Sequence, residues 1–162
     1  MAETIGKKAE KKVKEWLDRP QDGYCFDRLP DQMTGLYGSK NPCDFTLFKY
    51  PEMYYIESKA TEADRFDFVN ISEYQRDSLL LKSAIPHVHG VLFLLFATHK
   101  RAFVIDIREI SWLQEHGVKS LNIKKIASWG IAYVEVATIP NNRKALPDYT
   151  GEFKVADPLS HE

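Results

Sequence analysis

The stretch that decides the fold is PCDFTLFKYPEMYYIESKA, residues 42–60. Residues 43–49 alternate in polarity and are rich in strand-forming side chains, and residues 53–60 have the same character after the turn Tyr50-Pro51-Glu52. Two such runs around a short turn predict a β-hairpin. We therefore expect the acidic and basic residues of this stretch to lie on adjacent, paired strands.

The segments around the hairpin alternate between helical and strand patterns. Ser72 and Gln75 have the spacing of a capping box at the start of a helix, and so do Asp106 and Glu109. The uninterrupted apolar run at 90–97 is typical of a strand buried on both faces. Such alternation predicts an α/β fold with a mixed central sheet flanked by helices. The expected elements are helices at 4–18, 72–83, 106–117 and 122–128, strands at 24–28, 43–49, 53–60, 90–97, 102–105 and 131–138, and a polar loop at 61–70.

Composition limits the class of protein. The chain has 162 residues and a net charge of −1, and 44% of its residues are hydrophobic, which fits one globular domain. No apolar run approaches the roughly 20 residues that span a bilayer, so we expect a soluble, cytoplasmic protein. Cys25 and Cys43 are too few for a disulfide framework, and we expect two reduced, buried thiols. We expect a single domain at residues 1–138 and an extended, proline-containing tail at 139–162.

Asp44, Glu57 and Lys59 form the pattern with a chemical meaning. Side chains two residues apart on a strand share a face, so Glu57 and Lys59 point the same way, and pairing across the hairpin can bring Asp44 alongside Glu57. Two carboxylates in one place suit a hard cation such as Mg²⁺, and the Ser58 backbone carbonyl is a further candidate ligand.

Phosphodiester hydrolysis needs these residue types together. A bound cation polarises the phosphate and lowers the pKa of a bound water, and a nearby lysine such as Lys59 can orient that water or stabilise developing charge. A plainer alternative is a solvated Glu–Lys pair on a strand surface, which has no chemical role. The pattern favours a metal-dependent nuclease.

The arrangement PCDF followed by YIESKAT, at residues 42–45 and 55–61, resembles the PD-(D/E)XK nuclease superfamily. Within it, the chain is most similar to RecU-type Holliday junction resolvases and their phage relatives. The segment GKKAE at residues 6–10 resembles the first helix of that family, and residues 66–75 resemble the segment that leads into the helix after the active site. The resemblance extends over residues 4–126.

This resemblance implies a restriction-endonuclease-like core and a homodimer that cleaves DNA, in particular branched DNA. Asp44 and Glu57 would bind Mg²⁺, with Mn²⁺ as a substitute, and Lys59 would position the attacking water. Glu10 would act near the metal, and Gln75 would support the site or contact phosphate.

Two of these residues also have plain structural interpretations. Gln75 can bond back to the Ser72 backbone as the third residue of the capping box. Glu10 can be an ordinary acid on a helix surface. Four basic residues are either solvated or candidate phosphate contacts, which position nucleic acid without reading its sequence. These four are Lys7, Lys8, Lys11 and Arg65.

The substrate class has alternatives of its own. Only residues 19–43 separate the first helix from Asp44, and this interval is shorter than the stalk-bearing segment of RecU-type resolvases. Duplex or flap DNA in repair, restriction or phage genome processing is therefore an alternative substrate. A non-catalytic DNA-binding module on a nuclease fold is a rival of another class. His87 and His89 lack a third ligand in the local sequence, so we predict no metal site there.

Overall fold

The computed structural model describes residues 4–17, 24–30 and 41–136. Six strands form one mixed sheet in the order β1-β2-β3-β5-β6-β8, and β4 and β7 form a separate two-stranded sheet. The strands are β1 (Tyr24–Arg28), β2 (Phe45–Lys49), β3 (Glu52–Thr61), β4 (Arg65–Asp67), β5 (Val88–Phe96), β6 (Arg101–Asp106), β7 (Ser120–Asn122) and β8 (Tyr133–Val136). The helices are α1 (Ile5–Leu17), η1 (Phe68–Asn70), α2 (Glu73–Ser83), α3 (Ile107–Glu115) and η2 (Ile123–Trp129), of which η1 and η2 are 3₁₀.

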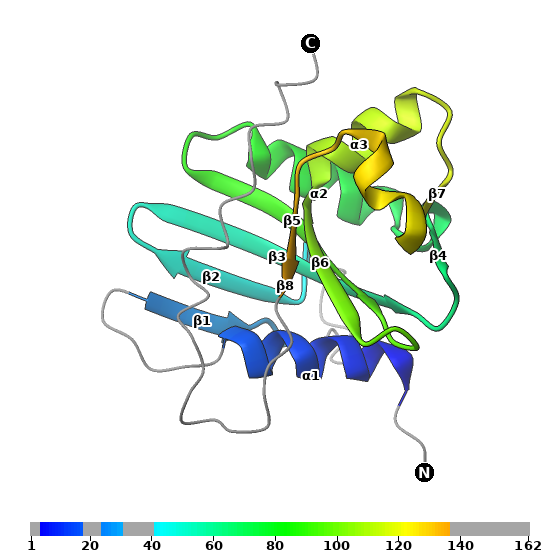
Figure 1. The fold of residues 1–162 in the computed structure, drawn as a ribbon. Coiled ribbons are helices and arrows are strands. Elements are labelled where there is room, and N and C mark those ends of the chain that lie inside the picture. Colours follow the sequence, from blue (N-terminus) through cyan, green and yellow to red (C-terminus); the bar gives the residue numbers. More distant parts are fainter. Residues whose placement is uncertain (1–3, 18–23, 31–40, 137–162) are drawn as a thin grey trace.

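The large sheet is covered by helices on both faces, with α1 on one side and α2 and α3 on the other (Figure 1). This confirms the predicted α/β class with a mixed central sheet, and it is consistent with a restriction-endonuclease-like core. None of the helices within the described ranges has the length and apolarity needed to cross a membrane.

The predicted hairpin is formed by β2 and β3, and Phe45 lies opposite Ile56. β3 then pairs in parallel with β5, so that Glu57 lies opposite Leu92. Parallel neighbours need a crossover connection, and α2 supplies it. β1, β6 and β8 pair antiparallel with their neighbours, which makes the sheet mixed.

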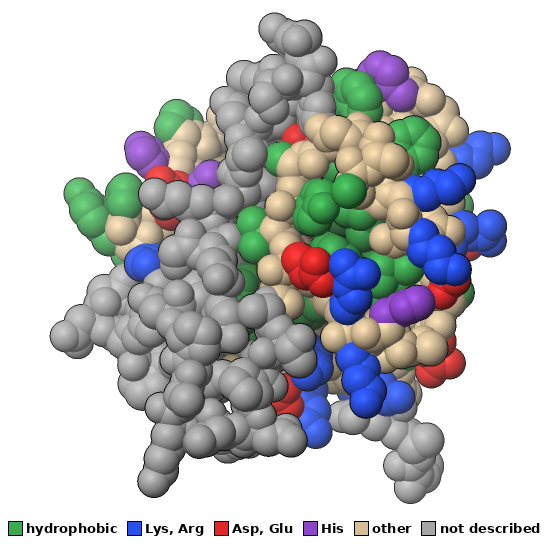
Figure 2. Space-filling view, viewed as in Figure 1, with side chains coloured by type: hydrophobic (Ala, Val, Ile, Leu, Met, Phe, Trp, Pro, Cys, Tyr) green, Lys and Arg blue, Asp and Glu red, His purple; other side chains and the backbone are tan. Residues whose placement is uncertain are grey.

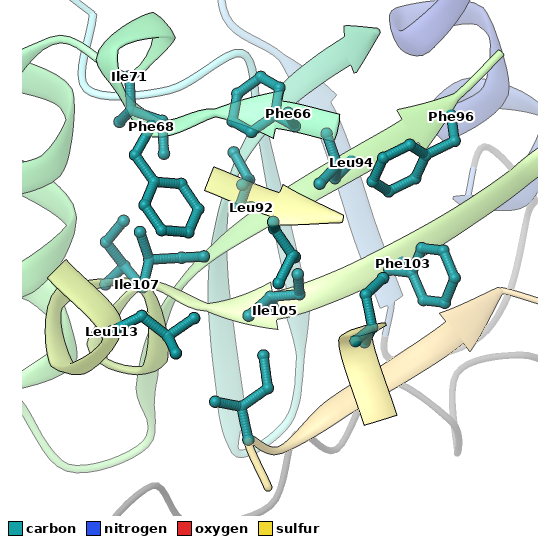
Figure 3. Close-up of a cluster of buried hydrophobic side chains, with 14 of the residues drawn as sticks. Phe66, Phe68, Ile71, Leu92, Leu94, Phe96, Phe103, Ile105, Ile107 and Leu113 are labelled. Atoms are coloured by element: carbon teal, nitrogen blue, oxygen red, sulfur yellow. The ribbon is translucent and has the colours of Figure 1, made fainter. Parts of the chain in front are cut away.

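Two apolar clusters lie on opposite faces of the sheet. Along β5 the side chains alternate between them, which explains why the sequence of this central strand is apolar without a break. On the α1 face, Trp16 packs against Phe93 with ring centroids 5.9 Å apart. On the opposite face, Phe66 and Phe68 lie near Leu92 (Figure 3). β5, the parallel neighbour of the strand that carries Glu57, is therefore packed between two apolar layers.

Helix α2 is fixed at both ends. Its start is the predicted capping box, in which Ser72 and Gln75 exchange hydrogen bonds. Near its end, the Ser83 hydroxyl accepts the Gly90 N–H at 2.8 Å. A Cβ at Gly90 would lie 2.6 Å from the Leu79 carbonyl oxygen, so α2 approaches β5 as closely as a glycine permits. The C-terminal half of α2 is thus packed closely against β5.

Two local expectations were wrong. The expected polar loop at 61–70 contains β4 and η1, because Phe66 and Phe68 turn into the core and β4 finds a partner in β7. The second capping box does not form as predicted: Asp106 accepts from the Arg108 N–H, and Glu109 is buried. The short helix expected at 122–128 is present as the 3₁₀ segment η2, which ends at Gly130 in the left-handed conformation. Residues 137–162, which include the expected tail, lie outside the described residues.

Candidate active site on strands β2 and β3

Asp44 lies at the start of β2, between β1 and β3. Its backbone N–H donates to the Ile56 carbonyl at 3.0 Å, and its carbonyl accepts the Leu29 N–H at 2.8 Å. Its carboxylate oxygen Oδ2 accepts two hydrogen bonds from Ser58, one from the backbone N–H at 2.9 Å and one from the hydroxyl at 2.7 Å. Asp44 therefore lies beside the segment of β3 that carries Glu57, in agreement with the predicted pairing.

Glu57 is buried in this site, with 3% of its surface exposed. Its Oε1 accepts a hydrogen bond from Gln75 Nε2 at 2.7 Å and lies 3.4 Å from Lys59 Nζ. Burial raises the pKa of Glu57 to about 8, and the charge of Asp44 adds to the rise, while Lys59 and Gln75 oppose it. The Glu57 carboxyl therefore gives up its proton less readily than a solvated glutamate does, and a bound cation would compete with that proton.

Gln75 both completes the capping box of α2 and contacts the candidate site. Its Oε1 accepts the Ser72 N–H at 3.2 Å, which completes the capping box of α2. Its Nε2 donates to Glu57 in the same conformation. One side chain thus joins the start of α2 to the buried carboxylate.

Ser58 makes two contacts that the sequence did not predict. Strand alternation turns its side chain away from Glu57, so the sequence offers only its backbone carbonyl as a candidate ligand. The hydroxyl nevertheless reaches Asp44, which precedes the regular part of β2. The N–H and the carbonyl of a strand residue face the same neighbouring strand, so the Ser58 carbonyl lies on the Asp44 side of β3.

Glu10 contacts a different partner. Both of its carboxylate oxygens accept hydrogen bonds from Arg28, at 3.1 and 3.3 Å. Within residues 4–17, 24–30 and 41–136, no group of three or more His, Cys, Asp or Glu side chains is arranged to hold a metal ion. The structure therefore does not join Glu10 to Asp44 and Glu57 as a third acidic ligand, because the Arg28 guanidinium binds its carboxylate.

The four basic candidates lie outside this cluster. Lys7, Lys8 and Lys11 are exposed on α1, and Arg65 on β4 forms an ion pair with Asp67 at 2.9 Å. Figure 2 shows Lys and Arg side chains gathered over the part of the molecule where β4 and β7 lie. A role for these residues in phosphate binding stays a prediction.

The two candidate histidines and the two cysteines differ in their burial and in the groups that they contact. His87 and His89 both contact Glu52, at 3.1 and 2.6 Å, at the first residue of β3 and away from Glu57 in the middle of that strand. Cys43 is buried as expected, and burial together with the Glu57 charge raises the pKa of its thiol to about 12. Cys25, in contrast, is exposed, because it lies on the outermost strand of the sheet.

The oxygen donors of this site suit a divalent cation. Asp44 accepts hydrogen bonds from Ser58, the residue next to the buried Glu57, so the two carboxylates lie close together in a poorly solvated place, and burial together with their mutual repulsion raises the pKa of Glu57. A hard cation relieves that repulsion and prefers oxygen ligands. Asp44, Glu57 and the carbonyl of Ser58 are the groups that would hold it.

Neither a family model nor a curated protein matches the chain. Among solved structures, it is similar to Hjc from Archaeoglobus fulgidus, a Holliday junction resolvase from an archaeal hyperthermophile. The two share 15% sequence identity with a TM-score of 0.47, over 64% of this chain and 78% of that chain.

Proposed function

We propose that the protein is a metal-dependent endonuclease that hydrolyses phosphodiester bonds in DNA. The observation that carries the proposal is the meeting of Asp44, buried Glu57 and Lys59 on two paired strands. Paired carboxylates with an adjacent lysine supply both a cation site and a positive charge beside it. An ordinary surface Glu–Lys pair is exposed to solvent, whereas this Glu57 is not.

Each residue has a distinct role in the proposal. Asp44, Glu57 and the Ser58 carbonyl would hold Mg²⁺ or Mn²⁺, which would supply polarisation of the phosphate and a lower pKa of a bound water. Lys59 orients the water or stabilises the charge that grows on the phosphate oxygens. Gln75 holds the Glu57 carboxylate in place through its 2.7 Å hydrogen bond. Glu10, whose carboxylate is bound by the Arg28 guanidinium, is given no contact with the metal in this proposal.

The substrate in the proposal is branched DNA, as in Holliday junction resolution, and this part rests on the sequence resemblance. A homodimer would present two sites to two strands. Lys7, Lys8, Lys11 and Arg65 would contact the phosphate backbone. The nuclease domain would comprise residues 1–138, with 139–162 as an extension, in a cytoplasmic protein. Cleavage of duplex or flap DNA is the alternative.

The test uses the purified protein with synthetic four-way junctions, flaps and plain duplexes, with Mg²⁺ or with EDTA. Asp44→Asn and Lys59→Met should each reduce cutting by at least about 100-fold and leave DNA binding intact, because they remove charge only at the site. Glu115→Gln, at an exposed position on α3, is the control and should cut normally.

Each outcome has a definite meaning. Robust cutting by the Asp44→Asn protein would overturn the mechanism. Equal cutting of duplex and junction would remove the branched-DNA assignment and favour the alternative substrate. Binding of DNA without cutting in Mg²⁺ would favour the non-catalytic binding module.

A further inference from the structure

The two carboxylates of the site are each held through one oxygen. Asp44 Oδ2 accepts both hydrogen bonds from Ser58, at 2.9 and 2.7 Å. Glu57 Oε1 accepts the Gln75 amide at 2.7 Å and lies 3.4 Å from Lys59 Nζ. The other oxygen of each group, Oδ1 or Oε2, takes part in none of these contacts. Both side chains are therefore anchored on one side, which leaves one oxygen of each for a ligand.

The anchor on Asp44 comes from a single residue. The Ser58 N–H is fixed by the backbone of β3, and the hydroxyl adds a second donor to the same oxygen. Hydrogen bonds to an ionised carboxylate are stronger than those between neutral groups. Ser58 is only 8% exposed, so water has little room to replace the hydroxyl if it is removed.

We propose that Ser58 is a positioning residue, whose hydroxyl fixes Asp44 through Oδ2 so that Oδ1 is presented to the divalent cation. The inference rests on the proposed function. It adds a residue whose side chain holds a metal ligand in position and does not itself bind the metal. The Ser58 hydroxyl does for Asp44 what the Gln75 amide does for Glu57. Loss of such a partner of a metal ligand typically weakens metal binding by about 10- to 100-fold.

The experiment measures Mn²⁺ binding by isothermal titration calorimetry, without DNA. Ser58→Ala should raise the Kd for Mn²⁺ by about 10- to 100-fold, and Ser58→Thr, which keeps the hydroxyl, should restore it. Junction cutting by Ser58→Ala should need a correspondingly higher Mn²⁺ concentration for half-maximal rate. At saturating Mn²⁺ its rate should return to within a few-fold of wild type, because the ligand itself is intact.

Ser83→Ala is the matched control. Ser83 is likewise buried, at 6% exposed, and its hydroxyl accepts the Gly90 N–H instead of contacting the site. This variant should unfold at a lower temperature and bind Mn²⁺ as the wild type does. A purely structural role for the Ser58 hydroxyl would make the two alanine variants alike in both measurements.

The outcomes separate this inference from the proposed function. If the wild type binds Mn²⁺ and cuts, but Ser58→Ala has an unchanged Kd, the positioning role is wrong and the nuclease proposal stands. If the wild type neither binds Mn²⁺ nor cuts DNA, both fail. Should Ser58→Ala not fold, Ser58→Thr and Ser58→Cys decide the matter, because a thiol is a weak donor. Equal Mn²⁺ affinity in those two variants would overturn the positioning role.

Discussion

Replacing Glu57 with glutamine should remove a pH dependence of stability that the buried carboxyl imposes on the protein. The pKa of Glu57 rises from its ordinary value of 4.5 to about 8 in the folded state. Between these two values the folded protein holds one more proton than the unfolded chain. The stabilisation from this group is therefore complete below the unfolded pKa and is lost as pH rises through the folded one, by about 1.4 kcal/mol per pH unit.

The assay is urea unfolding of wild type and Glu57→Gln in EDTA, from about pH 5.5 to about pH 7.5. Subtracting the two unfolding free energies cancels the titration of other groups. The unfolding free energy of the wild type minus that of Glu57→Gln should fall by about 3 kcal/mol over this range, because the wild type loses stability as pH rises. The substitution keeps the size of the side chain and an oxygen that can accept the Gln75 amide.

A difference that stays constant within about 0.5 kcal/mol would refute the reasoning, because a constant offset is what loss of packing alone would produce. Saturating Mn²⁺ should flatten the wild-type profile, since a bound cation takes the place of the proton on Glu57. The same cation should leave the profile of Glu57→Gln nearly unchanged.

Further predictions concern α2, its packing and α1, and urea unfolding checks each of them. Gln75→Ala should destabilise the protein by on the order of 1–2 kcal/mol, because it removes the capping acceptor and the donor to Glu57. Gln75→Glu should keep the cap but repel the Glu57 carboxylate, so its loss of unfolding free energy relative to the wild type should grow with pH. Gly90→Ala should cost roughly 1–3 kcal/mol, because its Cβ would lie 2.6 Å from the Leu79 carbonyl oxygen. Gly6→Ala, on α1 with no atom within 4 Å of the new Cβ, should instead stabilise by about 0.5–1 kcal/mol, and equal effects at the two glycines would contradict the close-contact explanation.

The elements that sequence predicted well are those with strong local signals. The hairpin of β2 and β3 follows from alternation around a short turn, and the start of α2 follows from the Ser72–Gln75 box. β4 and β7 have three residues each, and they pair across a long separation in the chain, with Arg65 opposite Asn122. Local sequence cannot indicate such a pairing, because tertiary contacts determine whether so short a strand forms.

Some contacts of the candidate site could likewise be predicted from the sequence, and others could not. Strand alternation sufficed to put Glu57 and Lys59 on one face and Asp44 beside them. The Ser58 hydroxyl contact depends on how the chain enters β2, just before regular pairing begins, and alternation alone points that side chain elsewhere. The binding of Glu10 by Arg28 depends on how α1, which packs against β3 and β5, is placed relative to β1, and no pattern in either segment reveals this.

The double use of Gln75 has a consequence for dynamics. One amide group both closes the first turn of α2 and holds Glu57. Ligand binding at the Glu57 carboxylate and opening of that turn are therefore thermodynamically coupled, and each affects the other by the same free energy. A ligand that pulls Glu57 away from Gln75 will loosen the turn, and one that fixes Glu57 will tighten it. Amide hydrogen exchange at Ser72 and Gln75, whose N–H groups form the box, thus offers a spectroscopic reporter of site occupancy that needs neither DNA nor turnover.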